Sequence, residues 1–340
     1  MRWQRGFVML WTERYRPARL EDIRGQERVI QLLVSCAASG TSPHLMLTGP
    51  HGTGKSAAIR CFAERLYGEN WEANTSIFQT ADLFSQGKKM LEEDERYTHL
   101  YQKSQSLIVN FKYILKWYAS MRPLDADFKL MVFEDAHTLT RDAQQGLRRI
   151  MERYSGTCRF VFSTTNQSAI IPAISSRCLP LFFAPVTSEV LIAQLSAIRE
   201  REQQGSSFAC TNDDLELIAV AAQGDMRRAI LMLQVAFQSG SCSNLAELSQ
   251  SETGTVAASA LNLIKSGDLR GGIRQLESLM IDYGLSGREV LSEIRTIAQR
   301  EYNHPLLALA LADADARIGH ANSEYIQIDA FATGIKEIFS

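Results

Sequence analysis

The stretch Leu45-Met-Leu-Thr-Gly-Pro-His-Gly-Thr-Gly-Lys-Ser56 joins a short apolar run to a loop rich in glycine. From Gly49 onward it fits the pattern G-x-x-x-x-G-K-[ST], in which small residues let backbone N–H groups surround a phosphate. The apolar run predicts a buried strand, and residues 57–63 predict a helix whose N-terminus points at the phosphate. This order of strand, loop and helix predicts a nucleotide-binding site.

The loop residues are expected to hold the phosphates and a metal ion. Lys55 would reach the β- and γ-phosphates, and the Ser56 hydroxyl would bind Mg²⁺. A nucleoside triphosphate with Mg²⁺ is therefore the predicted ligand. The rest of the cradle is predicted to comprise Gly49, Pro50, His51, Gly52, Thr53 and Gly54.

The bulk composition indicates an ordinary globular protein. The chain has 340 residues, of which 45% are hydrophobic and 22% charged, and this length predicts two or three domains. A net charge of −2 gives no global basic signature, so any nucleic-acid contact would depend on local patches. The cysteines form no C-x-x-C pair, which predicts neither a zinc site nor a disulfide framework. The sequence shows no export signal and no membrane-spanning run, and we expect a cytoplasmic protein without a membrane partner.

The secondary-structure pattern changes along the chain. Up to Pro185, strand-like runs alternate with helical patterns, which predicts an α/β P-loop module with a mostly parallel sheet flanked by helices. Beyond it the pattern is helical, with a turn or linker over 238–244. We expect a nucleotide-binding domain over 1–185, a small helical lid over 186–240 and an all-α domain over 241–340. The predicted strands are 45–48, 76–79, 130–133, 160–163 and 179–183.

A second nucleotide element is predicted in Lys129-Leu-Met-Val-Phe-Glu-Asp-Ala-His137. In P-loop ATPases an aspartate after this strand positions Mg²⁺ and a following glutamate activates the attacking water. Here Glu134 would hold the metal through water, and Asp135 is one methylene shorter than a glutamate base. Alternatively, Asp135 holds the metal and the base position falls on Ala136. A misplacement of about 1 Å can cost on the order of 10²-fold in rate, so both alignments predict binding with impaired hydrolysis.

The order of six motifs resembles that of AAA+ clamp-loader subunits, and together they resemble the small subunits of replication factor C, most closely the archaeal type. The second type, found where two small subunits coexist, is one alternative within it. The resemblance covers residues 11–233, and the eight residues before Met9 lie outside it, which makes Met9 an alternative first residue. The motifs are Trp11-Thr-Glu-Arg-Tyr-Arg-Pro17, Asp22-Ile-Arg-Gly-Gln26, the loop 49–56, Ala143-Gln-Gln-Gly-Leu-Arg-Arg-Ile-Met-Glu152, Ser175-Ser-Arg-Cys178 and Gly224-Asp-Met-Arg-Arg228.

The resemblance implies roles for further residues. Asn166 would be the first sensor of the γ-phosphate, and Arg227 the second sensor, carried by the lid. Arg177 would be an arginine finger that enters the neighbouring subunit's ATP site. The base and ribose side would be lined by Arg14, Tyr15, Arg16, Pro17, Ile23 and Gln26.

The resemblance also implies a function. The chain would be an ATPase subunit of a pentameric ring of large and small subunits, held by a C-terminal helical collar, which binds ATP and loads a sliding clamp onto primer–template DNA. Two alternatives stay open: a nucleotide-binding structural or regulatory subunit with little turnover, and an AAA+ remodeller in recombination or repair. Arg148 and Arg149 resemble central-helix arginines and could face a neighbour. Candidate DNA contacts are Lys112, Lys116, Arg122 and Arg141.

One segment departs from the family pattern. Residues 71–128 are longer by several helical turns than the resemblance predicts. The charged piece 87–105 is expected to be a surface excursion that contacts DNA or a partner, or else a tolerated insertion without function.

Overall fold

The computed structural model of the chain describes residues 9–203, 210–240, 252–302 and 304–339. The chain forms two compact units, residues 1–241 and 242–340, and each is described by itself. The residues before Met9 and most of the predicted linker lie outside the described residues. The predicted domain boundaries after 185 and 240 stay predictions.

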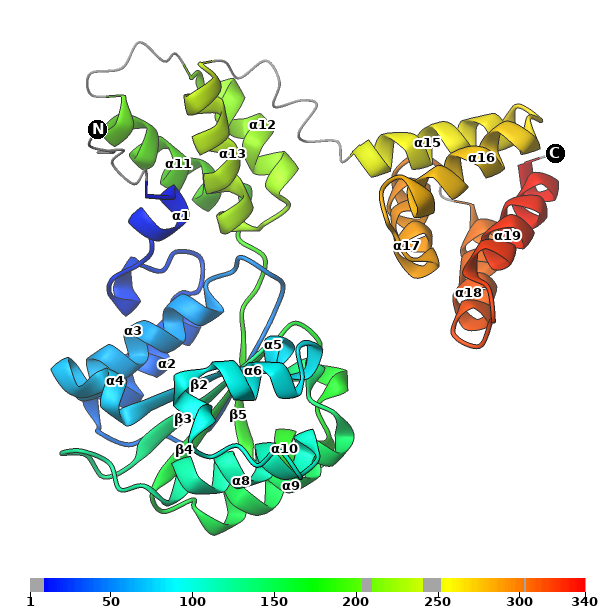
Figure 1. Cartoon of the computed structure of the whole chain (residues 1–340). Helices are drawn as coiled ribbons and strands as arrows, with labels where there is room; N and C mark the ends of the chain where they lie inside the picture. The colour runs from blue at the N-terminus through cyan, green and yellow to red at the C-terminus, as the bar shows by residue number, and fades with distance from the viewer. Residues whose placement is uncertain (1–8, 204–209, 241–251, 303, 340) are drawn as a thin grey trace, which may run out of the picture. The chain divides into compact units, whose positions relative to one another are not determined.

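The first unit contains a five-stranded parallel sheet with helices on both faces (Figure 1). The strand order is β2-β3-β4-β1-β5, so β1 lies between β4 and β5. The predicted fold class, a parallel sheet flanked by helices and followed by helical regions, is confirmed, and each predicted strand is found within two residues of its expected ends. The strands are β1 (His44–Thr48), β2 (Thr75–Gln79), β3 (Lys129–Glu134), β4 (Cys158–Thr164) and β5 (Cys178–Phe182).

The helices of the sheet-bearing part fall between these strands. They are α1 (Trp11–Arg14), α2 (Glu27–Ala38), α3 (Lys55–Tyr67), α4 (Trp71–Asn74), α5 (Thr80–Ser85), α6 (Lys88–Glu93), α7 (Glu95–Thr98), α8 (Leu107–Ser120), α9 (Arg141–Arg153) and α10 (Pro172–Ser175). Short 3₁₀ turns occur at η1 (Leu20–Asp22), η2 (Gly68–Asn70), η3 (Ala136–Thr138) and η4 (Gln167–Ala169).

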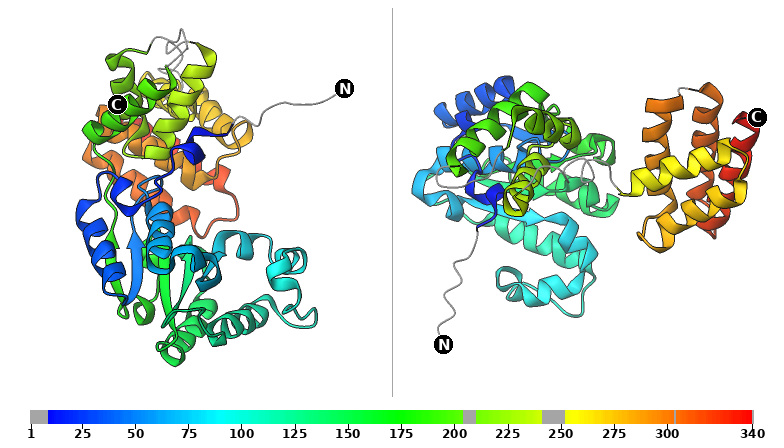
Figure 2. Two further views of the ribbon diagram at one scale, coloured as in Figure 1. Left: turned by 90° about the vertical axis from the view of Figure 1, so that its left-hand side faces the viewer. Right: turned by 90° about the horizontal axis from the view of Figure 1, so that it is seen from above.

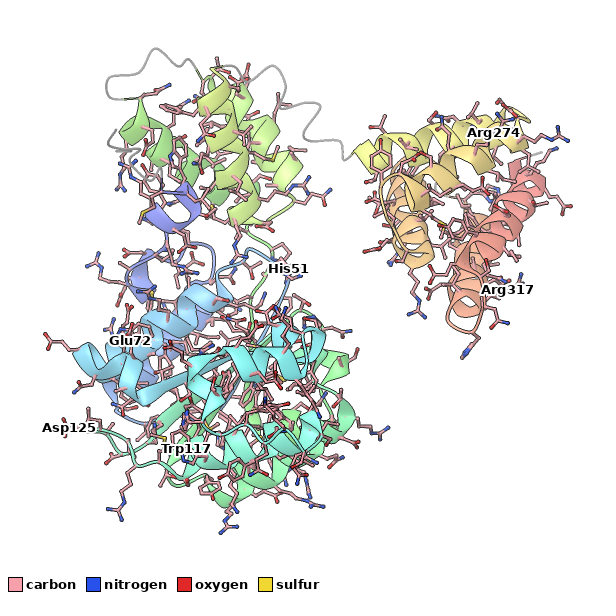
Figure 3. All side chains as sticks on the ribbon, viewed as in Figure 1. His51, Glu72, Trp117, Asp125, Arg274 and Arg317 are labelled. Carbon is pink, nitrogen blue, oxygen red and sulfur yellow. The ribbon has the colours of Figure 1, made fainter. Side chains whose placement is uncertain are left out.

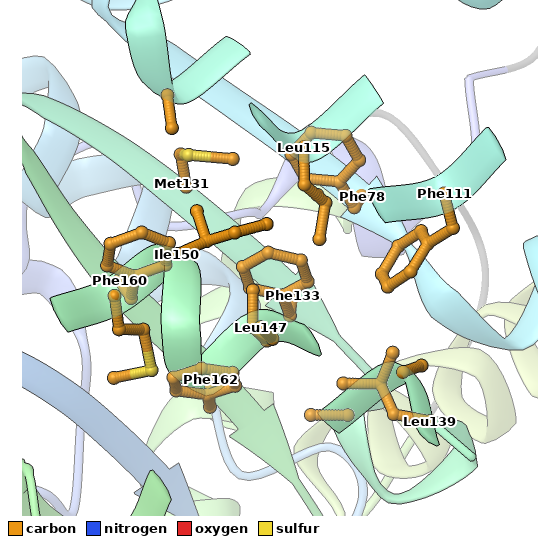
Figure 4. Packing of buried hydrophobic residues seen from close by; sticks show 14 of the residues in the cluster. Phe78, Phe111, Leu115, Met131, Phe133, Leu139, Leu147, Ile150, Phe160 and Phe162 are labelled. Atoms are coloured by element: carbon orange, nitrogen blue, oxygen red, sulfur yellow. The ribbon is translucent and has the colours of Figure 1, made fainter. Parts of the chain in front are cut away.

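The sheet is buried on both faces because its strands carry apolar side chains in unbroken runs. In β3, Leu130 and Val132 pack in the core that contains α2 and α3, whereas Met131 and Phe133 pack in the core that contains α8 and α9. Figure 4 shows the second core, where the rings of Phe78, Phe133 and Phe162 stack across three adjacent strands. This packing on both faces makes the sheet a rigid support for the loops at its ends.

The prediction that 87–105 is a surface excursion is wrong for its apolar residues. Leu91, Tyr97 and Leu100 are buried in the same core as β2, and the Tyr97 ring stacks on Phe78 at 6.1 Å between centroids. The piece holds few apolar residues, but these lie where α6, α7 and the following turn can bring them to one side. The segment is therefore a packed part of the nucleotide module.

The parallel register brings four strand ends to one edge. β1 leads into the glycine-rich loop, called the P-loop below (residues 49–56), and β3 ends at Glu134. Gln79 at the end of β2 is the register partner of Glu134, and Thr48 is that of Thr164. Because all strands point the same way, this edge collects the predicted nucleotide residues.

Three further helices, called the lid helices, complete the first unit: α11 (Ser188–Glu202), α12 (Asn212–Ala222) and α13 (Met226–Ser239). They pack on one another through apolar residues such as Leu195, Ile218 and Leu233. The two views in Figure 2 show α1 beside α13. The N-terminal segment is thus joined to the lid helices as well as to the sheet-bearing part.

The second unit is helical in its described residues and has its own core, which includes Leu261, Leu276, Ile294 and Ile328. It consists of α15 (Glu252–Lys265), α16 (Leu269–Ile281), α17 (Gly287–Ile297), the π-helical turn η5 (Ala298–Tyr302), α18 (Pro305–Ile318) and α19 (Glu324–Phe339). Among the described helices of the whole chain, none combines the length and apolar character needed to cross a membrane.

Candidate nucleotide-binding site

A cavity of about 340 Å³ lies against the P-loop in the first unit. The N-terminal segment, the ends of β2, β3 and β4, and the lid helices all contribute to its wall. His51, labelled in Figure 3, is the P-loop residue whose exposed side chain lies toward the lid helices. Of the predicted site residues, those lining the cavity are Tyr15, Arg16, Pro17, Ile23, His51, Gly52, Thr53, Gly54, Lys55, Ser56, Glu134, Asp135 and Arg227.

The P-loop takes the backbone shape that its glycines permit. Gly54 has a φ of 98° and caps the N-terminus of α3, which begins at Lys55. The Lys55 amine donates to the carbonyl oxygens of Gly49 (2.7 Å) and Pro50 (2.5 Å). Burial lowers the pKa of Lys55, and the nearby Asp135 carboxylate opposes this shift. The amine is therefore a donor held at a helix N-terminus, where anions bind favourably.

The lid helices touch the P-loop directly. The Met226 N–H donates to the Gly52 carbonyl oxygen at 3.1 Å. The Asp225 carboxylate caps α13 through the Arg228 N–H and lies so close to Gly52 that a Cβ there would come within 1.6 Å of its oxygen. This close approach requires glycine at position 52. Arg227, two residues after Asp225, lies in the wall of the cavity.

The two acidic residues after β3 have different surroundings. The Glu134 carboxylate accepts a hydrogen bond from the Gln79 side-chain amide at 2.6 Å. Asp135 adopts a left-handed conformation, with a φ of 51°, and its carbonyl oxygen accepts from the hydroxyls of Thr80 (2.8 Å) and Thr138 (2.9 Å). Of the two carboxylates, Asp135 has the larger effect on the pKa of Lys55. Glu134 is thus tied to β2, while Asp135 acts electrostatically on the P-loop lysine.

Thr80→Val is expected to lower the free energy of unfolding by about 1–3 kcal/mol. The buried Thr80 hydroxyl shares its one proton between the carbonyl oxygens of Glu134 (2.6 Å) and Asp135 (2.8 Å), and valine removes this donor. Chemical denaturation of the full chain measures this. Thr98→Val is the matched control, since its hydroxyl lies on the exposed surface of α7, and should stay within about 0.5 kcal/mol. Equal stabilities of the two variants would contradict the role given to Thr80.

Several predicted site residues lie outside the cavity wall. Arg14 forms an ion pair with Glu202 at 2.8 Å, and the buried Gln26 amide bonds to the backbone of Ala184 through both of its polar atoms. The exposed Asn166 accepts hydrogen bonds from Ser168. Gly49 and Pro50 contribute to the site through their carbonyl oxygens, which accept hydrogen bonds from Lys55. The roles assigned to these residues stay predictions.

Arg177 also lies outside this chain's own cavity. It follows α10 and is exposed, and its guanidinium donates to the Glu152 carboxylate at 2.7 Å and to the Ala173 carbonyl at 2.6 Å. Glu152 lies 3.6 Å from Arg148 as well. The side chain is therefore held at the surface by one carboxylate and one carbonyl.

Sequence reasoning missed several residues of the cavity wall, which the tertiary structure brings together. Gln79 ends β2, while Ser163 and Thr165 stand at the end of β4. Gln194 and Ile230 reach the cavity from α11 and α13. The positions of the strand ends could have indicated the first three, whereas the last two depend on how the lid helices pack.

The residues present fit a nucleoside triphosphate accompanied by a divalent cation. The loop has the glycines, the lysine and the helix N-terminus that a phosphate cradle needs. Within the described ranges, no group of three or more His, Cys, Asp or Glu side chains could hold a metal ion. Mg²⁺ is commonly bound by one or two protein ligands together with the substrate's phosphates, and Ser56 and Glu134 in the cavity wall offer oxygen atoms of that kind.

Comparisons with known proteins identify the family. The chain is 33% identical to a replication factor C small subunit of Methanocella arvoryzae, over 96% of each chain, and 32% identical to one of Picrophilus torridus, over 98% of this chain and 99% of the other. The chain belongs to the replication factor C small-subunit family. Residues 25–187 also match the family model described as the DNA polymerase III delta subunit.

Membership of the replication factor C small subunits confirms the predicted class, an AAA+ ATPase that works within a complex. The fold agrees with a solved structure of Thermotoga maritima RuvB, a Holliday junction branch migration motor, with a TM-score of 0.54 over 82% of this chain and 85% of the other. At 15% sequence identity this likeness shows the fold alone.

Proposed function

We propose that this chain binds ATP and Mg²⁺ in the cavity at the P-loop and works as one subunit of a pentameric clamp loader. The observation that carries the proposal is the P-loop cavity itself: Lys55, the acidic end of β3 and Arg227 of α13 all line it, in a chain that shares 33% identity with a replication factor C small subunit. The proposed location is the cytoplasm, as the family resemblance implies.

The residues at the cavity suggest a division of labour. The Lys55 amine would exchange the carbonyls of Gly49 and Pro50 for phosphate oxygens. The Ser56 hydroxyl and a β3 carboxylate would supply oxygen ligands to Mg²⁺. Arg227 would bring a positive charge from the lid helices. Bound ATP supplies the anhydride bond whose hydrolysis drives the complex.

The proposed partners are the other large and small clamp-loader subunits, a sliding clamp and primer–template DNA. ATP would favour the assembled, clamp-opening state, and hydrolysis would release the closed clamp on DNA, which is a population shift between two states. Lys116, Arg122 and Arg141 are exposed, as contacts to a DNA backbone require. Lys112 is half-buried, because its stem lies over Gly146 of α9.

For this subunit's own site we favour nucleotide binding with little turnover. The specific observation is that Glu134 is bonded to Gln79, while the remaining acidic side chain, Asp135, is a short carboxylate. Neither residue is therefore a glutamate whose carboxylate is free to activate a water molecule. The third function considered, an AAA+ remodeller in recombination or repair, has only a likeness of fold in its favour. Binding of the assembled complex to a sliding clamp would separate it from a clamp loader.

Lys55→Ala is expected to weaken binding of a fluorescent ATP analogue at least about tenfold, because charge-assisted hydrogen bonds are worth about 1.5–3 kcal/mol. Equilibrium titration of the full chain measures the affinity. Lys116→Ala is the matched control, since this lysine is exposed on α8 and far in sequence from the P-loop, and its affinity should equal that of the wild type. Unchanged affinity in Lys55→Ala would overturn the proposed nucleotide site.

A further inference from the structure

The N-terminal segment 11–17, called the strap below, is fastened to α13 at its start. Trp11 is only 5% exposed, and its backbone N–H donates to the side-chain oxygen of the buried Gln234 at 3.0 Å. The Trp11 ring packs against Phe237, with 5.2 Å between the ring centroids. One turn of helix would be marginal in water by itself, so these contacts hold α1 in place.

Glu202, the last residue of α11, fastens the middle of the strap. Its carboxylate accepts a hydrogen bond from the Tyr15 hydroxyl and forms an ion pair with Arg14 at 2.8 Å. The Glu202 side chain is 12% exposed, so these donors compensate for much of the solvation it has lost. Burial and the bond to Glu202 raise the pKa of Tyr15 to about 12, in agreement with a hydroxyl that keeps its proton and donates it.

The far end of the strap is attached to the sheet-bearing part. The Cys61 thiol donates to the Pro17 carbonyl oxygen at 3.3 Å, and Cys61 belongs to α3, the helix that begins at Lys55. The strap therefore runs from the lid helices to the P-loop helix. Five of its residues, Thr12, Glu13, Tyr15, Arg16 and Pro17, line the same cavity as Lys55 and Arg227.

We propose that Glu202 is a positioning residue for nucleotide binding: it ties the strap to the lid helices, so that strap and lid open and close over the cavity as one piece. The inference rests on the proposed nucleotide site. Residues of the strap and of the lid helices both line the cavity, so a ligand bound there would contact both parts of the wall. Loss of the tie frees the strap to move alone, which speeds release while leaving capture at the P-loop largely unchanged.

The test compares Glu202→Ala and the milder Glu202→Gln with the matched control Glu200→Ala, an exposed glutamate on the same helix. In the full chain without nucleotide, hydrogen exchange of 11–17 should become faster in Glu202→Ala, while α3 and α8 keep their protection. In stopped-flow measurements, release of a fluorescent ATP analogue should become about fivefold faster, which corresponds to about 1 kcal/mol, with the association rate within about twofold. The effect is smaller than the loss of a charge-assisted hydrogen bond to the ligand, because Glu202 acts through the strap. Glu200→Ala should match the wild type in both.

Tyr15→Phe provides a double-mutant cycle. If the two side chains act through their hydrogen bond, Tyr15→Phe with Glu202→Ala should release the analogue no faster than Glu202→Ala alone. Unchanged exchange of 11–17, or an unchanged release rate in Glu202→Ala and Glu202→Gln, would overturn the inference. Failure of the wild-type chain to bind the analogue would instead overturn the proposed function, and the exchange measurement without nucleotide tells the two failures apart.

Discussion

Arg177→Ala in this chain is expected to lower ATP turnover at the neighbouring subunit's site by about 10³-fold, the lower end of what an arginine finger contributes. The physical reason is that Arg177 does not line its own chain's cavity and is exposed at the surface. There its guanidinium would exchange the surface ion pair with Glu152 for phosphate oxygens in a second active site. The measurement is steady-state turnover of a reconstituted complex in which only the neighbouring subunit keeps its P-loop lysine.

Arg153→Ala is the control for this result, because it removes an exposed arginine from the end of α9 without touching Glu152. Nucleotide affinity of the Arg177→Ala chain itself should equal that of the wild type. A second variant, Glu152→Gln, weakens the ion pair that holds the Arg177 guanidinium at 2.7 Å and should leave assembly intact. Full turnover at the neighbouring site in Arg177→Ala would exclude this residue as the finger.

Much of the fold can be predicted because each strand carries a continuous apolar run. Leu130-Met-Val-Phe133 faces a core on each side of the sheet, and that pattern has few alternatives to a buried parallel strand. The segment 87–105 could not be predicted in this way, because its buried residues Leu91, Tyr97 and Leu100 are isolated in a polar stretch. Their burial depends on Phe78, a partner distant in sequence that stacks on Tyr97.

The site could be predicted where spacing alone fixes the chemistry. The P-loop needs its glycines and Lys55 at set intervals, and the structure lines the cavity with most of them. Gln26 shows the limit of such reasoning. A glutamine amide can line a ligand pocket or form hydrogen bonds with backbone groups, and only the tertiary structure shows that Gln26 bonds to the backbone of Ala184. Gln79 could be indicated as a residue at a strand end, but its contact with Glu134 could not, because that depends on the pairing of β2 with β3.

The double substitution Glu134→Asp with Asp135→Glu is expected to raise this subunit's own ATP turnover by on the order of 10²-fold, the cost of a misplaced catalytic group. It restores the Asp-Glu order that the family resemblance implies, with the shorter carboxylate at the metal and the longer one toward the water. The shorter side chain at 134 also loses reach to the Gln79 amide. Turnover is measured in a complex in which only this chain keeps its P-loop lysine.

Glu134→Asp alone is the matched control for the double substitution. It removes the contact with Gln79 but supplies no longer base at 135, so it should not raise turnover. Adding Lys55→Ala to the double variant should abolish the gain, since the gain must come from this chain's own cavity. If the double variant binds nucleotide as tightly as the wild type and turns it over no faster, the Glu134-Asp135 order does not limit hydrolysis. The wild-type arrangement, with Asp135 held in its left-handed turn by Thr80 and Thr138, would then be the working geometry of the site.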